Sequence, residues 1–207
     1  MKTGVNQQGE KYEDRYGGIL GLGLALLLSG CFGPTGYGKI DKTPYATKEC
    51  RKELSRGTEI DHSKKIDTII AYKGKRKMYA YKNGKIVDEY RFSLGKNADK
   101  GNKVKTGDYK TPEGSYRIVR KKCDSRLYKS LMISYPNASD RARARANGVS
   151  PGGYITIHGQ PKWNADGRGD SYTLSNDWTE GCLAIPNADM DELWRAVENG
   201  VKIEIHT

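Results

Sequence analysis

The sequence predicts a mainly β domain with a few short helices. Its 207 residues include 25 glycines and 14 tyrosines but two phenylalanines, a composition that favours turn-rich β structure over a helical bundle. Several runs alternate apolar and polar residues with a period of two, which is typical of half-buried strands. The length is sufficient for one domain with its own core and an additional leader or tail.

Residues 1–31 predict an export segment of the lipoprotein type. Residues 17–28 are apolar but shorter than the about 20 residues that a transmembrane helix needs, so they suit the core of a signal peptide. Leu28-Ser29-Gly30-Cys31 resembles a bacterial lipobox, in which the cysteine is lipidated and becomes the mature N-terminus. A buried strand is the alternative, and the charges before this run are balanced rather than net positive. Because Phe32 and not aspartate follows the cysteine, we expect an exported, periplasmic protein anchored in the outer rather than the inner membrane.

Residues 32–65 predict a tether between this anchor and the domain. Gly, Pro, Lys and Thr predominate there, with one short helix expected around residues 48–56. Cys50 in the tether and Cys123 in the domain are candidates for a disulfide, since an exported protein meets an oxidising environment. A zinc site is the alternative, although the chain has no Cys-x-x-Cys pair and its three histidines are scattered. We therefore expect neither a metal nor a cofactor.

The domain is expected to span residues 66–207 and to open with a β meander. Residues 66–72 and 77–81 are β runs, and residues 86–94 form the next strand. Asn83-Gly84 is a strong hairpin turn, because a type I′ turn needs a positive φ at both central residues.

Turn chemistry and alternation predict the remaining strands. Thr111-Pro112-Glu113-Gly114 predicts a turn before a strand, since proline presets φ and glycine supplies a positive φ. Further strands are expected over residues 131–137, 154–159 and 201–205, with a loop over residues 160–176.

Two helices are expected among these strands. Alanines and arginines favour a helix over residues 139–147, with Ser139 or Asp140 as its cap and Gly148 as its end. Near the C-terminus, Asn187 is expected to cap a helix over residues 188–199.

The formal net charge of +11 predicts an acidic or polyanionic neighbour. Nucleic acid is one such neighbour, but the sequence has no zinc-finger, RRM or helix-turn-helix signature. An anionic cell wall or a phospholipid surface agrees better with the predicted export segment. Arg141, Arg143 and Arg145 would form a basic patch on the first helix, with a merely solvated basic face as the alternative.

Cys182 and His158 form the candidate active site. His158 ends the alternation of its strand, and Cys182 follows Gly181, whose missing Cβ allows strained dihedrals and a close approach of substrate. A cysteine and a histidine brought together from separate elements form the minimal thiolate–imidazole nucleophile. The alternative is that Cys182 is a small buried hydrophobe and His158 a satisfied core residue.

The segments around both residues resemble the active-site segments of the L,D-transpeptidase catalytic domain family, a group of peptidoglycan-acting cysteine enzymes. Thr179–Asn187 and Ile155–Gly159 carry the resemblance, and the meander, the Thr106–Ile118 segment and the Leu131–Asn137 strand match in the same order. The resemblance covers about residues 66–207 and implies a mixed, β-sandwich-like fold.

The resemblance also implies roles for individual residues. Cys182 would attack an amide carbonyl as a thiolate whose pKa is lowered by His158. The backbone carbonyl of Gly159 would orient the imidazole, and the N–H groups of Gly181 and Cys182 would stabilise the oxyanion. Substrate contacts are expected from residues close to this pair in sequence: Tyr154, Trp178, Thr179 and Glu180, with Trp163 and Tyr172 as further candidates for the rim of the groove.

The implied substrate is the tetrapeptide stem of peptidoglycan, attacked at the carbonyl of its third residue. The acyl group would pass to an amine, giving a 3–3 cross-link or a wall-attached lipoprotein. Glu180 and Ala184 depart from the commoner pattern, which has histidine before Gly-Cys and arginine two residues after the cysteine. A divergent branch of the family with similar departures includes enzymes that use water as the acceptor, so a hydrolase is the first alternative. A catalytically silent, wall-binding lipoprotein is the second.

Overall fold

The computed structural model describes residues 4–5, 11–12, 45–124, 126–160 and 169–207. The chain divides into two units, residues 1–35 and 36–207. In the first, β1 (Gly4–Val5) pairs with β2 (Lys11–Tyr12). Cys31, predicted to be lipidated, and the apolar run before it lie outside the described residues. Among the residues described, no helix is long and apolar enough to cross a bilayer.

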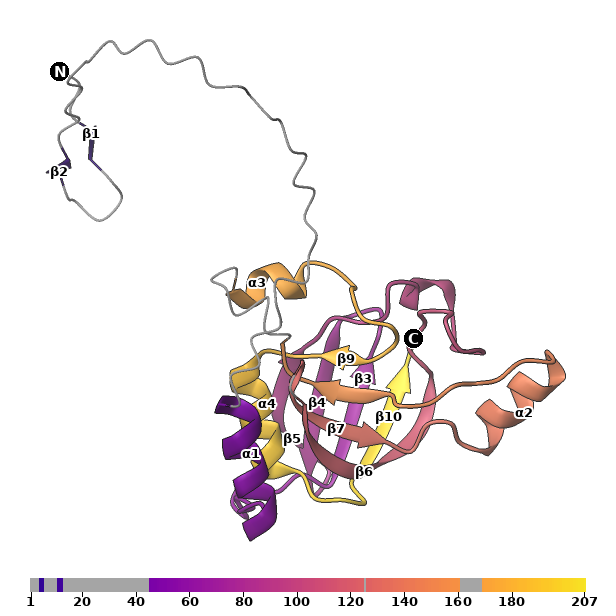
Figure 1. Cartoon of the computed structure of the whole chain (residues 1–207), viewed down its shortest axis with the longest axis horizontal. Coiled ribbons are helices and arrows are strands. Elements are labelled where there is room, and N and C mark those ends of the chain that lie inside the picture. The colour runs from indigo at the N-terminus through magenta and orange to yellow at the C-terminus, as the bar shows by residue number, and fades with distance from the viewer. Residues whose placement is uncertain (1–3, 6–10, 13–44, 125, 161–168) are drawn as a thin grey trace. The chain divides into compact units, whose positions relative to one another are not determined.

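One mixed sheet of eight strands forms the second unit, in the order β5-β4-β3-β10-β6-β7-β8-β9 (Figure 1). The pairs β3–β10 and β8–β9 are parallel, and the other pairs are antiparallel. The strands are β3 (Thr68–Tyr72), β4 (Lys77–Lys82), β5 (Lys85–Arg91), β6 (Gly114–Asp124), β7 (Tyr128–Ile133), β8 (Thr156–His158), β9 (Leu183–Ala184) and β10 (Lys202–His206).

The long strand β6 turns this sheet into two layers. Its residues before Ile118 pair with β10, those from Ile118 onward pair with β7, and a bulge lies between Ile118 and Arg120. A bulge bends its strand, so β7, β8 and β9 fold over β3, β4 and β5 (Figure 1). Ser93 and Ala184 then exchange two backbone hydrogen bonds of 2.9 Å, which joins the two ends of the sheet. The prediction of a mainly β, sandwich-like fold is confirmed.

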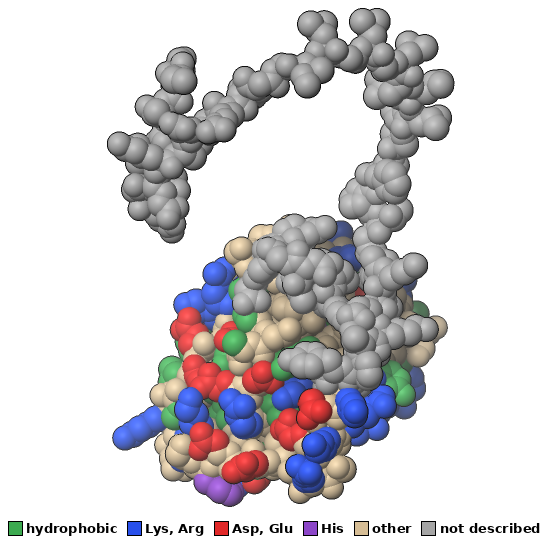
Figure 2. Space-filling view, turned by 60° about the vertical axis from the view of Figure 1, so that its left-hand side comes forward, with side chains coloured by type: hydrophobic (Ala, Val, Ile, Leu, Met, Phe, Trp, Pro, Cys, Tyr) green, Lys and Arg blue, Asp and Glu red, His purple; other side chains and the backbone are tan. Residues whose placement is uncertain are grey.

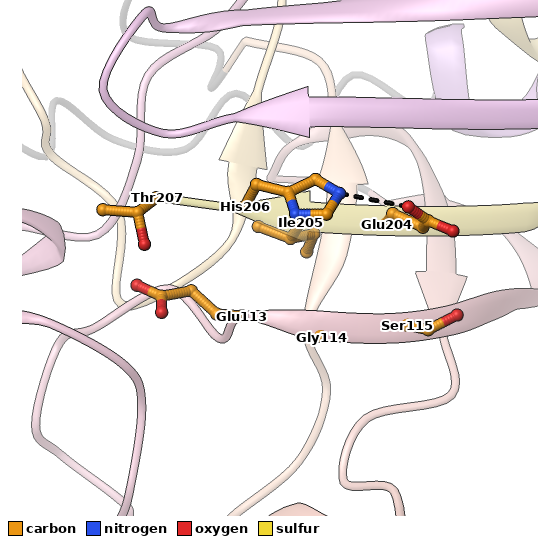
Figure 3. A pocket seen from close by; sticks show the side chains of 7 residues that line it. All are labelled: Glu113, Gly114, Ser115, Glu204, Ile205, His206 and Thr207. Atoms are coloured by element: carbon orange, nitrogen blue, oxygen red, sulfur yellow. Dashed lines mark hydrogen bonds and ion pairs between the residues drawn. The ribbon is translucent and has the colours of Figure 1, made fainter.

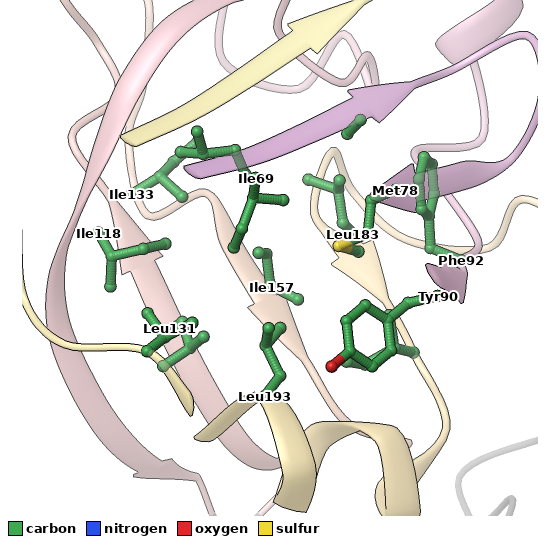
Figure 4. Packing of buried hydrophobic residues seen from close by; sticks show 14 of the residues in the cluster. Ile69, Met78, Tyr90, Phe92, Ile118, Leu131, Ile133, Ile157, Leu183 and Leu193 are labelled. Atoms are coloured by element: carbon green, nitrogen blue, oxygen red, sulfur yellow. The ribbon is translucent and has the colours of Figure 1, made fainter. Parts of the chain in front are cut away.

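The core lies between the layers because the strands alternate. In β3 and β10 every second residue is buried, so one face of each strand points inward. Figure 4 shows side chains from both layers meeting there. Burying one such aliphatic side chain stabilises the fold by about 1.5–3 kcal/mol. Buried residues of this cluster are Ile69, Met78, Tyr90, Phe92, Ile118, Leu131, Ile133, Ile157, Leu183 and Leu193.

The helix expected in the tether is present as α1 (Tyr45–Arg56), but it is part of the domain. Cys50 is buried and forms a disulfide with Cys123 of β6, with the two Cα atoms 5.7 Å apart. Glu53 accepts a hydrogen bond of 2.7 Å from Trp194 Nε1 and pairs with Lys129 at 3.2 Å. The disulfide is therefore the correct alternative for these cysteines, and any spacer is formed by residues before this helix.

Removing this disulfide is expected to lower the free energy of unfolding by about 2–4 kcal/mol, because it closes a long loop. The bond joins residues 73 positions apart. The Cys50→Ala, Cys123→Ala double variant, compared with the oxidised chain by denaturant titration, tests this. An unchanged unfolding midpoint would show that the contacts of Glu53 alone hold α1 in place.

The helix expected over residues 139–147 is α2 (Ala138–Ala146), and its cap is not the predicted one. Asn137 Oδ1 accepts the N–H of Asp140, and the Asp140 carboxylate accepts the N–H of Asn137, so these two residues form a capping box. Arg143 pairs with the buried Asp140 at 3.0 Å, whereas Arg141 and Arg145 are exposed. The cap lies two residues before the earlier of the two predicted cap positions.

The region after β8 also differs from expectation. Part of the predicted loop forms a short helix, α3 (Gly169–Leu174). Earlier in the chain, between β5 and β6, a 3-10 turn lies at Ala98–Lys100. The C-terminal helix α4 (Asn187–Ala196) starts one residue earlier and ends sooner than predicted. Asn187 does not cap it, because its Oδ1 accepts the N–H of Gln160 at 2.7 Å, and Pro186 occupies the cap position.

Candidate active site

Cys182 and His158 meet because β8 and β9 run in parallel. Ile157 pairs with Leu183 and His158 pairs with Ala184, so the residue before β9 lies beside Thr156, at the start of the strand that ends in His158. Cys182 is half-buried, and His158, which is 1% exposed, lies close enough to the thiol to lower its pKa. The predicted pairing of these two side chains is present in the structure.

The imidazole of His158 is held from two sides. Its Nδ1 lies 2.7 Å from the carbonyl oxygen of Gly159, and since a carbonyl can only accept, Nδ1 carries the proton. The ring of Trp178 packs edge-on against the imidazole, with centroids 5.7 Å apart. Nε2 is therefore the ring nitrogen left to take the thiol proton.

The thiol has two further neighbours. Thr156 Oγ1 donates a hydrogen bond to Cys182 Sγ at 3.6 Å, and the carbonyl oxygen of Tyr154 lies 3.7 Å from the same sulfur. The sequence prediction missed Thr156, although period-two alternation places it on the same face of β8 as His158.

These contacts set the protonation of the nucleophile. Burial acts to raise the pKa of Cys182, since it disfavours the charged thiolate. The hydrogen bond and the charge of His158, together with hydrogen bonds from the hydroxyl and the backbone N–H of Thr156, outweigh burial. The pKa of Cys182 therefore lies below its usual value, which favours the thiolate that attacks carbonyl groups.

Thr156→Val is expected to slow acylation of Cys182 about tenfold near neutral pH, because a hydrogen bond to a charged group contributes about 1.5–3 kcal/mol. Loss of the hydroxyl removes a contact that lowers the thiol pKa, so the rate should rise toward its plateau at higher pH than in the wild type. Stopped-flow acylation across pH measures both effects. Thr156→Ser keeps the hydroxyl and should retain the wild-type profile, and an unshifted valine profile would contradict this role.

The turn before Cys182 requires glycine at position 181. Gly181 has a φ of +131°, and a Cβ there would lie 2.6 Å from the carbonyl oxygen of Lys110. The close approach expected at this glycine is thus made by the backbone of another loop.

Two predicted roles in this turn are wrong in the structure. The N–H of Gly181 donates to Thr179 Oγ1 at 3.1 Å, so this N–H is occupied and does not serve as an oxyanion donor. Thr179 is 4% exposed, and its hydroxyl donates to the Cys182 carbonyl at 2.8 Å, so it braces the turn instead of contacting substrate. No hydrogen bond from the N–H of Cys182 is seen within the described parts of the chain, so it can donate to an oxygen bound beside the thiol.

The other predicted contacts divide between exposed and packed side chains. Tyr154 is 79% exposed with a φ of +59°, and Glu180 is also exposed, so both are accessible beside the thiol. Trp178 is half-buried against His158. Trp163 and the side chain of Tyr172 lie outside the described residues.

Gly159 and Asp177 position the site in ways that the sequence did not reveal. A Cβ on Gly159 would lie 2.4 Å from Asn187 Oδ1 and 3.0 Å from Tyr128, so only glycine fits between them. Asp177 accepts the N–H of Leu94 at 2.9 Å and pairs with Arg76. The carboxylate therefore anchors the start of the turn that ends in Cys182.

Comparison with known proteins agrees with this geometry. A family model described as the L,D-transpeptidase catalytic domain (YkuD) matches residues 66–205, more than half of the chain. YafK of Escherichia coli (strain K12), named provisionally as an L,D-transpeptidase, is 30% identical over 178 residues, which cover 84% of this chain and 61% of YafK.

Among solved structures, the helical cell shape determining protein Pgp2 from Campylobacter jejuni has a TM-score of 0.52 at 22% identity, covering 77% of this chain and 55% of that one. A mutant of Pgp2 gives a TM-score of 0.51 at 25% identity, covering 73% of this chain and 52% of the mutant. The chain thus spans less than two thirds of the length of each relative. From its matched domain and its sheet, this chain belongs to the L,D-transpeptidase catalytic domain family.

Proposed function

We propose that Cys182 carries out acyl transfer on peptidoglycan stem peptides. The observation that carries this proposal is the thiol held against His158, with the other imidazole nitrogen fixed by the Gly159 carbonyl. Family membership supports the substrate class. The chemistry needs no cofactor, because thiol, base and oxyanion donor all come from the chain.

In the first half-reaction, the thiol of Cys182 gives its proton to His158, and the thiolate attacks the carbonyl carbon of the third stem residue. The carbonyl oxygen becomes an oxyanion that accepts the N–H of Cys182. The C–N bond to the terminal D-amino acid then breaks, and His158 returns the proton to the departing amine. A thioester on Cys182 remains.

In the second half-reaction, an acceptor attacks the thioester while His158 takes its proton. The C–S bond breaks, and the thiolate of Cys182 is restored. An amine acceptor gives a 3–3 cross-link or a protein joined to the wall, whereas water gives a free carboxylate. Tyr154, whose backbone carbonyl lies beside the thiol, and Glu180, two residues before Cys182, have exposed side chains and are the proposed contacts to donor and acceptor.

Hydrolysis is the second candidate function, and residue 184 favours it. Ala184 is fully buried and pairs with both His158 and Ser93, so it offers no side chain to hold a substrate carboxylate. A chain that lacks such a contact has less means to fix a peptide acceptor, and water then competes better. A wall-attached lipoprotein would be a substrate of this reaction instead of its product.

We also propose that the chain is exported and acts from a lipid anchor at Cys31 in the periplasm. The apolar run and the lipobox-like residues before Cys31 support this proposal. Mass spectrometry of the membrane-extracted protein would reveal a diacylglyceryl-modified N-terminus. A mature chain that retains residues 1–30 would contradict the anchor.

Intact-protein mass with a carbapenem tests whether Cys182 acylates at all. The wild-type chain is expected to gain one adduct that Cys182→Ala lacks. A wild-type chain without an adduct would favour the catalytically silent, wall-binding lipoprotein. Muropeptide analysis of treated sacculi then separates the acceptors: new cross-linked dimers indicate transfer, whereas free stems or released proteins without new dimers indicate hydrolysis.

A further inference from the structure

The outer face of β3, β4 and β10 carries a row of aromatic side chains. Alternation along the strands turns Ile69, Ala71 and the buried residues paired with them on β4 and β10 into the core. The residues between these buried positions face away from the core. Strand register then places Tyr72 beside His206 on one side and Lys77 on the other, and Ile70 between Tyr79 and Glu204. All of these outward residues are half-buried or exposed.

The rings of this row contact one another. Tyr72 stacks on His206 with centroids 5.5 Å apart and an interplanar angle of 25°, and it meets Tyr79 edge-on at 6.1 Å. Lys75 Nζ lies 4.7 Å from the centre of the Tyr72 ring. The three rings form a continuous half-exposed surface, and this aromatic row leads directly into a pocket.

The pocket lies where β6 begins and β10 ends, with a volume of about 520 Å³. In Figure 3 the imidazole of His206 points along β10 toward Glu204, and Glu113 and Ser115 come from the neighbouring strand. The lining is mostly polar, and His206 is the ring that the pocket shares with the aromatic row. The lining residues are Glu113, Gly114, Ser115, Glu204, Ile205, His206 and Thr207.

The charges of this face favour a neutral ligand over a polyanion. Lys73 pairs with Glu113 at 2.7 Å, Lys77 pairs with Glu89 at 2.5 Å, and Glu204 pairs with both Lys202 and His206. A polyanion would need several unpaired cations, whereas these pairs offer donors and acceptors side by side and Lys75, over the Tyr72 ring, adds a single further cation. Figure 2 shows the same mixture of acidic and basic side chains on another side of the molecule.

Sugar chains combine the two features that this face would recognise. Each pyranose ring presents C–H groups that pack against the negative face of an aromatic ring, and its hydroxyl and acetamido groups exchange hydrogen bonds with side chains.

The pocket is also close to the nucleophile along the backbone. Lys110 touches Gly181 of the Cys182 turn, and Glu113 lines the pocket. Three residues extend at most about 11 Å, and a stem peptide cut at its third residue has the same reach. A glycan seated at the pocket could thus present its own stem to Cys182.

We propose that this face, from Tyr79 and Tyr72 to the pocket at His206, binds the N-acetylated glycan strand of peptidoglycan. The proposal rests on the proposed function for its choice of polymer. It predicts that binding of the strand does not require the stem peptide.

Soluble chitin oligosaccharides, which are N-acetylated and neutral and carry no stem, are the probe, titrated against the full-length Cys182→Ser chain by calorimetry. Tyr72→Ala is expected to weaken binding about tenfold, which corresponds to 1.4 kcal/mol. Tyr72→Phe keeps the ring and should bind as the parent does. Tyr79→Ala is the second variant, so a failure of Tyr72→Ala to fold leaves the test intact.

Three outcomes would overturn the proposal: no binding of the chitin oligosaccharides, equal binding by the parent and both alanine variants, or affinity that collapses between about 50 and 200 mM salt as a polyanion site would. Because this binding needs no turnover, an inactive Cys182 would leave its result unaffected. In the active chain, Tyr72→Ala should raise KM for polymeric peptidoglycan while leaving kcat on a free tetrapeptide unchanged.

Discussion

Replacing His158 with glutamine is expected to slow carbapenem acylation of Cys182 by about 100- to 10,000-fold, the usual contribution of a positioned general base. His158 is the main group that lowers the pKa of the thiol against the effect of burial. Without it, burial dominates, the pKa rises, and the neutral thiol is a poor nucleophile. The rate of adduct formation, followed by intact mass at fixed pH, gives the measurement.

Cys182→Ala is the matched control, since it should give no adduct while its melting temperature stays near that of the wild type. A His158→Gln chain that acylates within about tenfold of the wild type would remove the imidazole from the mechanism. Raising the pH should partly restore the rate of this variant, because hydroxide ionises the thiol without help. A merely misfolded chain would not recover in this way.

Gly181→Ala is expected to lower the free energy of unfolding by at least about 2 kcal/mol and to abolish acylation. A non-glycine residue at a φ of +131° is strained by about 1–3 kcal/mol, and the added Cβ would lie 2.6 Å from the Lys110 carbonyl. Backbone cannot yield as a flexible side chain does, so overpacking adds a similar cost. Denaturant titration and carbapenem adduct formation measure the two losses.

Gly148 provides the control for backbone strain alone. Its φ is +65°, yet a Cβ there would meet nothing within 4 Å. Gly148→Ala should therefore cost about 1–2 kcal/mol and leave acylation unchanged. Equal losses in the two variants would show that contact with Lys110 does not matter.

Local signals were sufficient for most strands and for the reactive pair. Alternation over residues 66–72 and 201–205 identified β3 and β10, and Asn83-Gly84 marked the hairpin between β4 and β5. The His158 strand was recognisable for the same reason. These features depend on neighbours in sequence, which a sequence displays directly.

Features that depend on distant partners were not predictable. Thr179 looks like a site residue by position, but its hydroxyl is committed to Gly181 and Cys182. Asn187 has the composition of a helix cap, but its amide instead binds Gln160 across the domain. In both cases a tertiary hydrogen bond overrode a local preference, and the neighbouring residues in the sequence do not indicate which distant group forms that bond.

The covalent link between α1 and β6 has a mechanical consequence. Tension applied to the chain ahead of Tyr45 and resisted near the C-terminus passes from Cys50 through the sulfur bridge into Cys123. The 72 residues between them carry none of this load, because the bridge joins positions 73 apart. This unloaded stretch contains Lys110, whose backbone packs against the turn before Cys182. Tension applied from the N-terminal side would therefore not displace Lys110 from the turn that positions the sulfur.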